Sequence, residues 1–181
     1  MTVTIRPATP DEVPLIVRWR QEAADWLATK GTDQWSDAGL SVEAFVDRVR
    51  QSIAAGETWI ADVDGVPAAT IAIDEWANPG LWTASELHES VMVHRMITDP
   101  AFRGRGLGKV LLDHADSIAQ QRSKRYVRLD AWTTNTDLHD YYEHLGFRPV
   151  RIVPEFRTRS AALFERPVHA EVPAGGTDGE A

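Results

Sequence analysis

The chain has 181 residues, of which 43% are hydrophobic and 25% charged, and this balance is ordinary for one globular domain with a real core. The formal net charge of −8 argues against a nucleic-acid partner and is compatible with a cationic substrate such as an amine. The absence of cysteine excludes disulfides, thiolate metal sites and an acyl-cysteine intermediate, and it fits a reducing cytoplasm. The first residues contain no apolar signal core and no run approaches the roughly 20 apolar residues of a membrane span, so we expect a soluble, cytoplasmic protein without a membrane partner.

The first half of the chain predicts one strand, two helices and a hairpin. Apolar residues recur at helical spacing in two segments, and Trp19 and Trp26 fall on one face of the first, where we expect them in the core. The dipeptide Asp64-Gly65 between two alternating runs is a strong hairpin signal. The expected elements are a strand at 3–5, a helix capped by Thr9 or Asp11 and ended by Lys30-Gly31, a helix between Ser41 and Gly56, strands at 58–62 and 68–73, and irregular chain over 75–86.

The second half alternates strands with helices. The helix between the strands at 91–97 and 126–132 is a crossover, so these two strands should run parallel. The other expected elements are a short helix capped within 133–136 and ended by Gly146, and strands at 147–153 and 161–165. The whole order, β-α-α-β-β-β-α-β-α-β-β, predicts a mixed α/β fold in a single domain over 1–167. The tail over 168–181 is rich in Ala, Gly, Pro and acidic residues, and we expect it to be disordered.

A glycine-rich segment, Arg103-Gly104-Arg105-Gly106-Leu107-Gly108-Lys109, lies between the strand at 91–97 and the helix that follows. Alternating glycines let the backbone turn sharply and bring N–H groups against a ligand, and the start of the helix adds its dipole to the same space. With three basic side chains around it, the segment predicts a pocket for a phosphate or pyrophosphate. The alternative interpretation is a glycine-rich surface turn with incidental arginines.

Two well-known phosphate-binding designs fit this segment poorly. A P-loop would need glycine in place of Arg103 and a hydroxyl in place of Val110, so it fails twice. A dinucleotide fingerprint would place its third glycine on Lys109, although Asp130 lies about where a ribose-binding acid is expected. A nicotinamide-dependent enzyme therefore stays as a runner-up hypothesis.

Three motifs occur in order along the second half of the chain. Arg103, Gly106 and Gly108 match R-x-x-G-x-G, the stretch from His94 to Pro100 leads into them, and Tyr142-Glu143-His144-Leu145-Gly146-Phe147 matches Y-E-x-x-G-F. Together with the element order from Val3 to about Val153, these motifs resemble the GCN5-related N-acetyltransferase (GNAT) superfamily.

The resemblance implies a GNAT-like α/β fold, in which helices flank a central mixed, mostly antiparallel sheet and a parallel strand pair is splayed around acyl-CoA. It implies an N-acetyltransferase with acetyl-CoA as cosubstrate and no metal, in which a primary amine attacks directly within a ternary complex. A homodimer is consistent with it. A CoA-binding regulatory or partner-binding module without turnover is the alternative of a different class.

The resemblance also assigns residues to the coenzyme. The pyrophosphate would lie on the N–H groups from Arg103 to Lys109, where side chains at the glycine positions would hold the phosphates away. Pantetheine would pair with the backbone of the preceding strand, whose N–H at about Met96 would polarise the thioester carbonyl. Asn135 would donate a hydrogen bond to CoA or would cap a helix. The implied coenzyme-binding residues are Met96, Ile97, Thr98, Arg103, Gly104, Arg105, Gly106, Leu107, Gly108, Lys109 and Asn135.

Two side chains are the implied catalytic residues. Tyr142 aligns with the tyrosine that faces the CoA sulfur and would supply a proton or a hydrogen bond to the leaving thiolate, whereas Tyr141 should be core. His94 would be the base, and strand alternation places it on the same face as Met96. The alternatives are that Tyr142 only packs and that His94 is a buried, hydrogen-bonded residue. Many relatives carry a carboxylate at the position of Met92, and the remaining candidate bases are Glu75 and Glu89.

The acceptor amine has the least specific signal. In the family, the first two helices and their connection cover the acceptor. Here that connection contains Asp33 and Trp35, which could bind an amine by charge pairing and cation–π contact. Glu86, with Trp76 and Trp82, could line the same cleft, although tryptophans more often serve packing.

Overall fold

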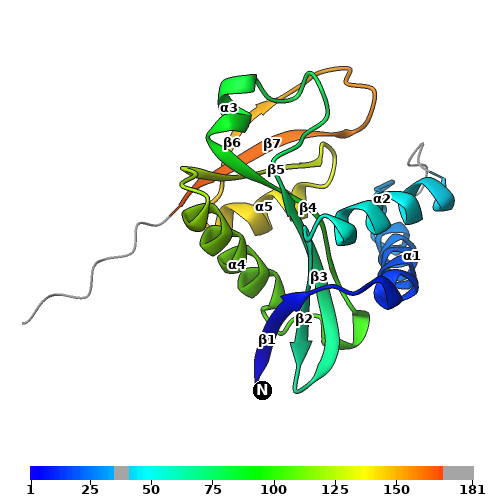
Figure 1. Cartoon of the computed structure of the whole chain (residues 1–181). Helices are drawn as coiled ribbons and strands as arrows, with labels where there is room; N and C mark the ends of the chain where they lie inside the picture. Colours follow the sequence, from blue (N-terminus) through cyan, green and yellow to red (C-terminus); the bar gives the residue numbers. More distant parts are fainter. Residues whose placement is uncertain (35–40, 169–181) are drawn as a thin grey trace, which may run out of the picture.

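The computed structural model describes residues 1–34 and 41–168, so Trp35 and the predicted tail beyond Val168 lie outside the described residues. Seven strands form one sheet in the order β1-β2-β3-β4-β5-β7-β6 (Figure 1). The strands are β1 (Val3–Pro7), β2 (Thr58–Val63), β3 (Val66–Asp74), β4 (Ser90–Thr98), β5 (Tyr126–Trp132), β6 (Arg148–Ile152) and β7 (Ser160–Pro167). The helices are η1 (Pro10–Glu12), α1 (Val13–Thr29), α2 (Val42–Ala54), α3 (Ala84–His88), η2 (Pro100–Phe102), α4 (Leu107–Gln121) and α5 (Thr136–His144).

The strand directions follow from the connections. β4 and β5 run parallel across the α4 crossover, and every other neighbouring pair is antiparallel. This confirms the predicted fold class and the parallel pair. The irregular chain expected over 75–86 contains the start of α3, which Thr83 and Glu86 open with a reciprocal capping box.

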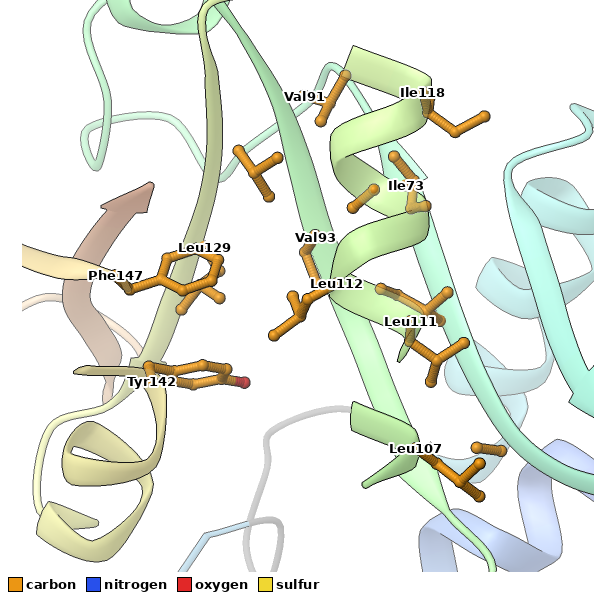
Figure 2. Packing of buried hydrophobic residues seen from close by; sticks show 14 of the residues in the cluster. Ile73, Val91, Val93, Leu107, Leu111, Leu112, Ile118, Leu129, Tyr142 and Phe147 are labelled. Carbon is orange, nitrogen blue, oxygen red and sulfur yellow. The ribbon is translucent and has the colours of Figure 1, made fainter. Parts of the chain in front are cut away.

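Helices cover both faces of the sheet. On one face α4 packs its apolar side, including Leu111 and Leu112, against β4 and β5 (Figure 2). On the other face α1 and α2 bury Trp19 and Phe45 against the sheet (Figure 1). Trp26 is 43% exposed, so its predicted place in the core is wrong. No helix within the described ranges is long and apolar enough to cross a membrane.

The two parallel strands pair over only part of their length. The β4–β5 register runs from Ser90↔Tyr126 to Val93↔Leu129 and stops there. Figure 2 shows the two strands moving apart beyond this point, with α4 along one arm and α5 beside the other. β4 and β5 are therefore a parallel pair that splays apart after Val93, as the resemblance predicts.

A β-bulge in β4 lies at the same level. The β3–β4 register changes between Ala72↔His94 and Thr70↔Ile97, so two residues of β4 oppose one of β3. One of the two is Arg95, which has a φ of +49°, unusual for a side chain of this size.

The bulge changes which side chains share a face. Val93 and Met96, the second residue of the bulge, both pack into the core beneath α4, whereas Met92 packs on the opposite face with Leu163. His94 is two residues after Met92 and precedes the bulge, so its side chain lies on the same face as that of Met92. It therefore lies on the face of the sheet opposite to that of Met96. The predicted placement of His94 and Met96 on one face is wrong, because the extra residue breaks the alternation of the strand.

Candidate active site

The glycine-rich segment forms a tight loop at the start of α4. Gly104 and Gly106 have φ values of +75° and +74°, which side chains rarely adopt. Gly106 is the N-cap of α4, and since it has no side chain, no side-chain oxygen caps the first N–H groups of the helix. These N–H groups can therefore bind an anion. Leu107 and Gly108 are buried at the helix start.

The three basic side chains of this loop lie in different surroundings. The Arg103 guanidinium is 4.5 Å from the centre of the Trp26 ring, and that of Arg105 is 5.0 Å from the centre of the Phe102 ring. Lys109 forms an exposed ion pair with Asp113, with its Nζ 2.6 Å from Oδ2. Within the described residues no carboxylate pairs with either arginine, so both keep their charge available to a ligand.

Tyr141 lies across the start of α4. A Cβ atom built on Gly108 would be 2.0 Å from the Tyr141 hydroxyl oxygen, which shows how closely the phenol approaches the helix backbone. Tyr141 is 39% exposed, so the prediction that it belongs to the core is wrong. The sequence motif drew attention to its neighbour, and only the direction of α5 reveals that this phenol covers the loop.

Tyr142 extends from the opposite arm of the parting strands. Its ring packs against Phe147 and Phe164 and is only 8% exposed. Figure 2 shows the hydroxyl pointing away from Phe147 and toward the arm formed by β4 and α4. Among the described residues no group forms a hydrogen bond with this hydroxyl. Burial raises the pKa of Tyr142 above its usual value, and Tyr141 and Asp130 raise it further, so the phenol stays protonated and can donate.

The three β4 residues predicted to contact pantetheine begin with Met96, the second residue of the bulge. The side chain of Met96 packs beneath α4 close to Gly108, and Ile97 is buried against α1 and α2. Thr98 pairs with Ala69 of β3. Neither described register of β4 gives Met96 a partner. The structure thus brings Met96 and the glycine loop together, while a contact with pantetheine stays a prediction.

His94 lies at the point where β4 and β5 separate, on the face opposite α4. Its Nε2 is 3.0 Å from Oδ1 of Asp74 and 2.9 Å from the carbonyl oxygen of Trp76. The side chain is 16% exposed, and the Trp76 ring lies 6.4 Å from it, centre to centre. No local sequence pattern points to Asp74, because nothing links the end of one strand to a histidine 20 residues later.

The charges around His94 change its acidity. Burial is the largest influence and lowers the pKa of His94, but the hydrogen bond and charge of Asp74 and the charge of Asp130 together raise it above its ordinary value. Asp130 is itself a buried acid whose pKa is raised by burial, although Ser160 donates a hydrogen bond to it. A histidine in these surroundings can accept a proton and is stabilised once it is charged.

Both carboxylates predicted to bind the acceptor, Asp33 and Glu86, have partners within the protein. Asp33 accepts a hydrogen bond from Trp132 Nε1 at 2.8 Å and forms an ion pair with Arg159. Glu86 forms an ion pair with Arg151 at 2.7 Å, and hydrogen bonds from Arg151 lower the pKa of Glu86 to about 2. These contacts join loops and strands and bring neither carboxylate to His94, so an acceptor-binding role for them stays a prediction.

The other candidates also have structural partners. Asn135 accepts a hydrogen bond from the Leu138 N–H as the N-cap of α5 and donates one to Gln34, which favours the capping alternative. Glu75 pairs with Lys124 and Arg122, and Glu89 pairs with Arg125. Met92 is fully buried. Within residues 1–34 and 41–168 no group of three or more His, Asp or Glu side chains is placed to hold a metal ion.

Comparisons with known proteins agree with this geometry. The model of the acetyltransferase (GNAT) family matches residues 20–147. The uncharacterized N-acetyltransferase YesJ of Bacillus subtilis (strain 168) is 28% identical over 172 residues, which cover 91% of this chain and 90% of that protein.

Two solved structures are similar in fold. A GNAT-family acetyltransferase from Listeria monocytogenes superposes with a TM-score of 0.73 at 24% identity, covering 91% of this chain and 94% of the other. The PaiA N-acetyltransferase from Thermoplasma acidophilum, solved in complex with coenzyme A, has a TM-score of 0.69 at 16% identity, with 92% and 99% covered. At these identities the structures support the fold alone.

Proposed function

Because the chain belongs to the acetyltransferase (GNAT) family, we propose that it transfers the acetyl group of acetyl-CoA to a primary amine by direct attack within a ternary complex. The proposal places this activity in a single domain over residues 1–167 acting in the cytoplasm. It includes no metal and no covalent acyl-enzyme, for which the sequence offers no cysteine.

One observation carries the proposal: β4 and β5 separate after Val93, and the Tyr142 hydroxyl points from one arm toward the other (Figure 2). The glycine loop lies at the start of α4 on one arm, and the Tyr142 hydroxyl extends from the other (Figure 2). The PaiA N-acetyltransferase, which has the same fold, was solved with coenzyme A, and this supports an equivalent site here.

On the donor side, the N–H groups over 103–109 would bind the pyrophosphate, with Arg103 and Arg105 neutralising its charge. Pantetheine would extend along Met96, Ile97 and Thr98. The thioester carbonyl would then lie near the Met96 N–H, which would stabilise the oxyanion that forms on attack. The raised pKa of Tyr142 makes complete proton transfer to the thiolate costly, so the phenol would act mainly by donating a hydrogen bond to the leaving sulfur.

On the acceptor side, His94 would remove a proton from the ammonium group before attack. It lies on the face opposite α4, so the amine would approach the thioester from the side of α1 and α2. Trp76, which is 51% exposed and next to His94, would cover part of the acceptor.

Calorimetric titration with acetyl-CoA, desulfo-CoA and NAD tests the coenzyme assignment. We expect micromolar binding of both CoA compounds and none of NAD. Failure to bind either CoA compound would refute the pyrophosphate site, and binding of NAD alone would favour the nicotinamide alternative.

A panel of primary amines, comprising an amino acid, a polyamine and a peptide with a free N-terminus, then tests turnover by following release of the CoA thiol. Acetylation of at least one amine is the expected result. Tight CoA binding without acetylation of any amine would favour a binding module over an enzyme.

A further inference from the structure

The chain makes a tight turn at the end of β3, beside His94. The Trp76 N–H donates a hydrogen bond of 2.9 Å to Oδ1 of Asp74, which closes a turn over residues 74–76. The same oxygen lies 3.0 Å from Nε2 of His94, and the Trp76 carbonyl oxygen lies 2.9 Å from that nitrogen. The turn thus presents two oxygens to one ring nitrogen.

These contacts determine the tautomer of the imidazole. A backbone carbonyl can only accept a hydrogen bond, so Nε2 must carry the proton that this contact requires. The neutral ring then has its lone pair on Nδ1. Among the described residues no group forms a hydrogen bond with Nδ1. A histidine with a purely structural role would be expected to use both nitrogens, whereas this one has two acceptors at one nitrogen and none at the other.

We propose that Asp74 is a positioning residue that holds His94 with Nδ1 free, and that Nδ1 takes the proton from the ammonium group of the acceptor. The inference rests on the proposed acetyl transfer. The ammonium N–H bond breaks as Nδ1–H forms, and the free amine attacks the thioester carbon. The C–N bond forms and the C–S bond breaks. The thiolate leaves toward the Tyr142 hydroxyl, which donates a hydrogen bond to it, and it takes the second proton of the attacking nitrogen, so that the products are the amide and the CoA thiol.

The surrounding charges favour this role. Asp74 on β3 and Asp130 on β5 are negative groups that stabilise the imidazolium, and Glu57, which precedes β2, lies in the same electrostatic environment. Arg95 on β4 opposes them. The acidic neighbours outweigh the arginine and the burial, so the charged ring formed by proton transfer is stabilised in the site.

Nitrogen-detected NMR of the protein labelled at its six histidines measures the tautomer and the pKa directly, with His94→Gln to assign the signal. In the wild type we expect neutral His94 to carry its proton on Nε2. In Asp74→Asn we expect its pKa to fall by about one unit or more, because a hydrogen-bonded charge is lost. Asp47→Asn, which changes an exposed carboxylate on α2, should leave the pKa of His94 unchanged. A proton on Nδ1 in the neutral wild-type ring, or an unchanged pKa in Asp74→Asn, would overturn the inference.

The pH dependence of kcat/KM, measured with the best amine of the panel, provides the second test. The base must be neutral to act, so we expect kcat/KM to rise with pH through the pKa of His94. In Asp74→Asn this rise should move to lower pH by the shift that NMR measures. If the NMR pKa moves while the kinetic profile does not, His94 is not the base and the inference is wrong, although acetyl transfer stands. If no amine is acetylated, the proposed function fails, and the catalytic part of the inference fails with it.

Discussion

The loop over 103–109 and the cluster around His94 flank the same strand, β4, but they are built from different parts of the chain. The loop is seven consecutive residues, and it offers backbone N–H groups at a helix start. The cluster offers side chains from β3, β4 and β5, brought together by strand pairing and by a bulge. The loop binds through backbone N–H groups, so it depends on which of its residues are glycine. The cluster acts through side chains, so it depends on the register in which the strands pair.

This difference predicts how each site responds to substitution. The loop should lose its affinity for the coenzyme when a side chain is added at Gly104 or Gly106, because the backbone must then leave its left-handed conformation. The cluster should fail when a functional group is removed, even if the fold is unchanged. Substitutions in the loop and in the cluster therefore test that contrast.

Gly106→Val should weaken acetyl-CoA binding by about a hundredfold or more. A branched side chain at φ +74° is strained by about 1–2 kcal/mol, and relief of the strain would turn the first N–H groups of α4 away from the phosphates. Loss of two charge-assisted hydrogen bonds costs about 3 kcal/mol. Calorimetric titration measures the affinity. Gly65→Val is the matched control, since Gly65 has a φ of +83° in the β2–β3 turn and should show the strain without the loss of binding. Equal affinity in both variants would contradict the pyrophosphate assignment.

Tyr142→Phe should lower kcat by about 10- to 100-fold with little change in CoA affinity. A hydrogen bond to a charged sulfur contributes about 1.5–3 kcal/mol, and the ring that packs on Phe147 and Phe164 is retained. Because the hydroxyl has no partner among the described residues, the free energy of unfolding should change by less than about 0.5 kcal/mol. Tyr126→Phe removes the same group at the start of β5 and should not alter kcat. An unchanged kcat in Tyr142→Phe would remove this residue from the mechanism.

The same contrast explains what the sequence could predict. The loop from Arg103 to Lys109 can be predicted as a candidate site because glycine spacing is local information, and Tyr142 can be predicted as a candidate because its motif is contiguous. The position of His94 was predicted, but its face was not, since the bulge at Arg95 is a property of the β3–β4 register. Asp74 was missed for the same reason.

The start of α3 was missed for a different reason. The capping box of Thr83 and Glu86 is a local pattern, and it could have predicted this helix. The tryptophans and acidic residues nearby instead suggested an acceptor site. A polar residue beside an aromatic one is common on any surface, so that pattern carries little information until the fold supplies its partners.

Arg103→Gln should weaken acetyl-CoA binding by about three- to tenfold, much less than the glycine variant. The guanidinium stacks on Trp26 at the protein surface, where solvent and salt screen its attraction to a phosphate. The loss should be largest at low ionic strength and should shrink in high salt. Titrations at two salt concentrations, with Arg18→Gln on the exposed side of α1 as the control, measure this dependence. A loss that does not change with salt would indicate that Arg103 acts by shaping the loop.

If the ion pair with Arg151 is the whole role of Glu86, Glu86→Gln leaves the KM for the acceptor unchanged and lowers stability by about 1 kcal/mol near neutral pH, a value reduced for solvent screening. Arg151 holds the pKa of this carboxyl at about 2, well below the value of the unfolded chain, so its stabilisation is complete above the unfolded pKa and is lost as the pH falls through the folded one. Denaturant unfolding of both proteins should therefore give curves that differ at pH 7 and converge toward pH 2. Glu89→Gln, which removes a half-buried carboxylate paired with the exposed Arg125, is the control and should have a smaller effect. A raised KM with unchanged stability would instead assign Glu86 to the acceptor site, as the local sequence pattern predicts.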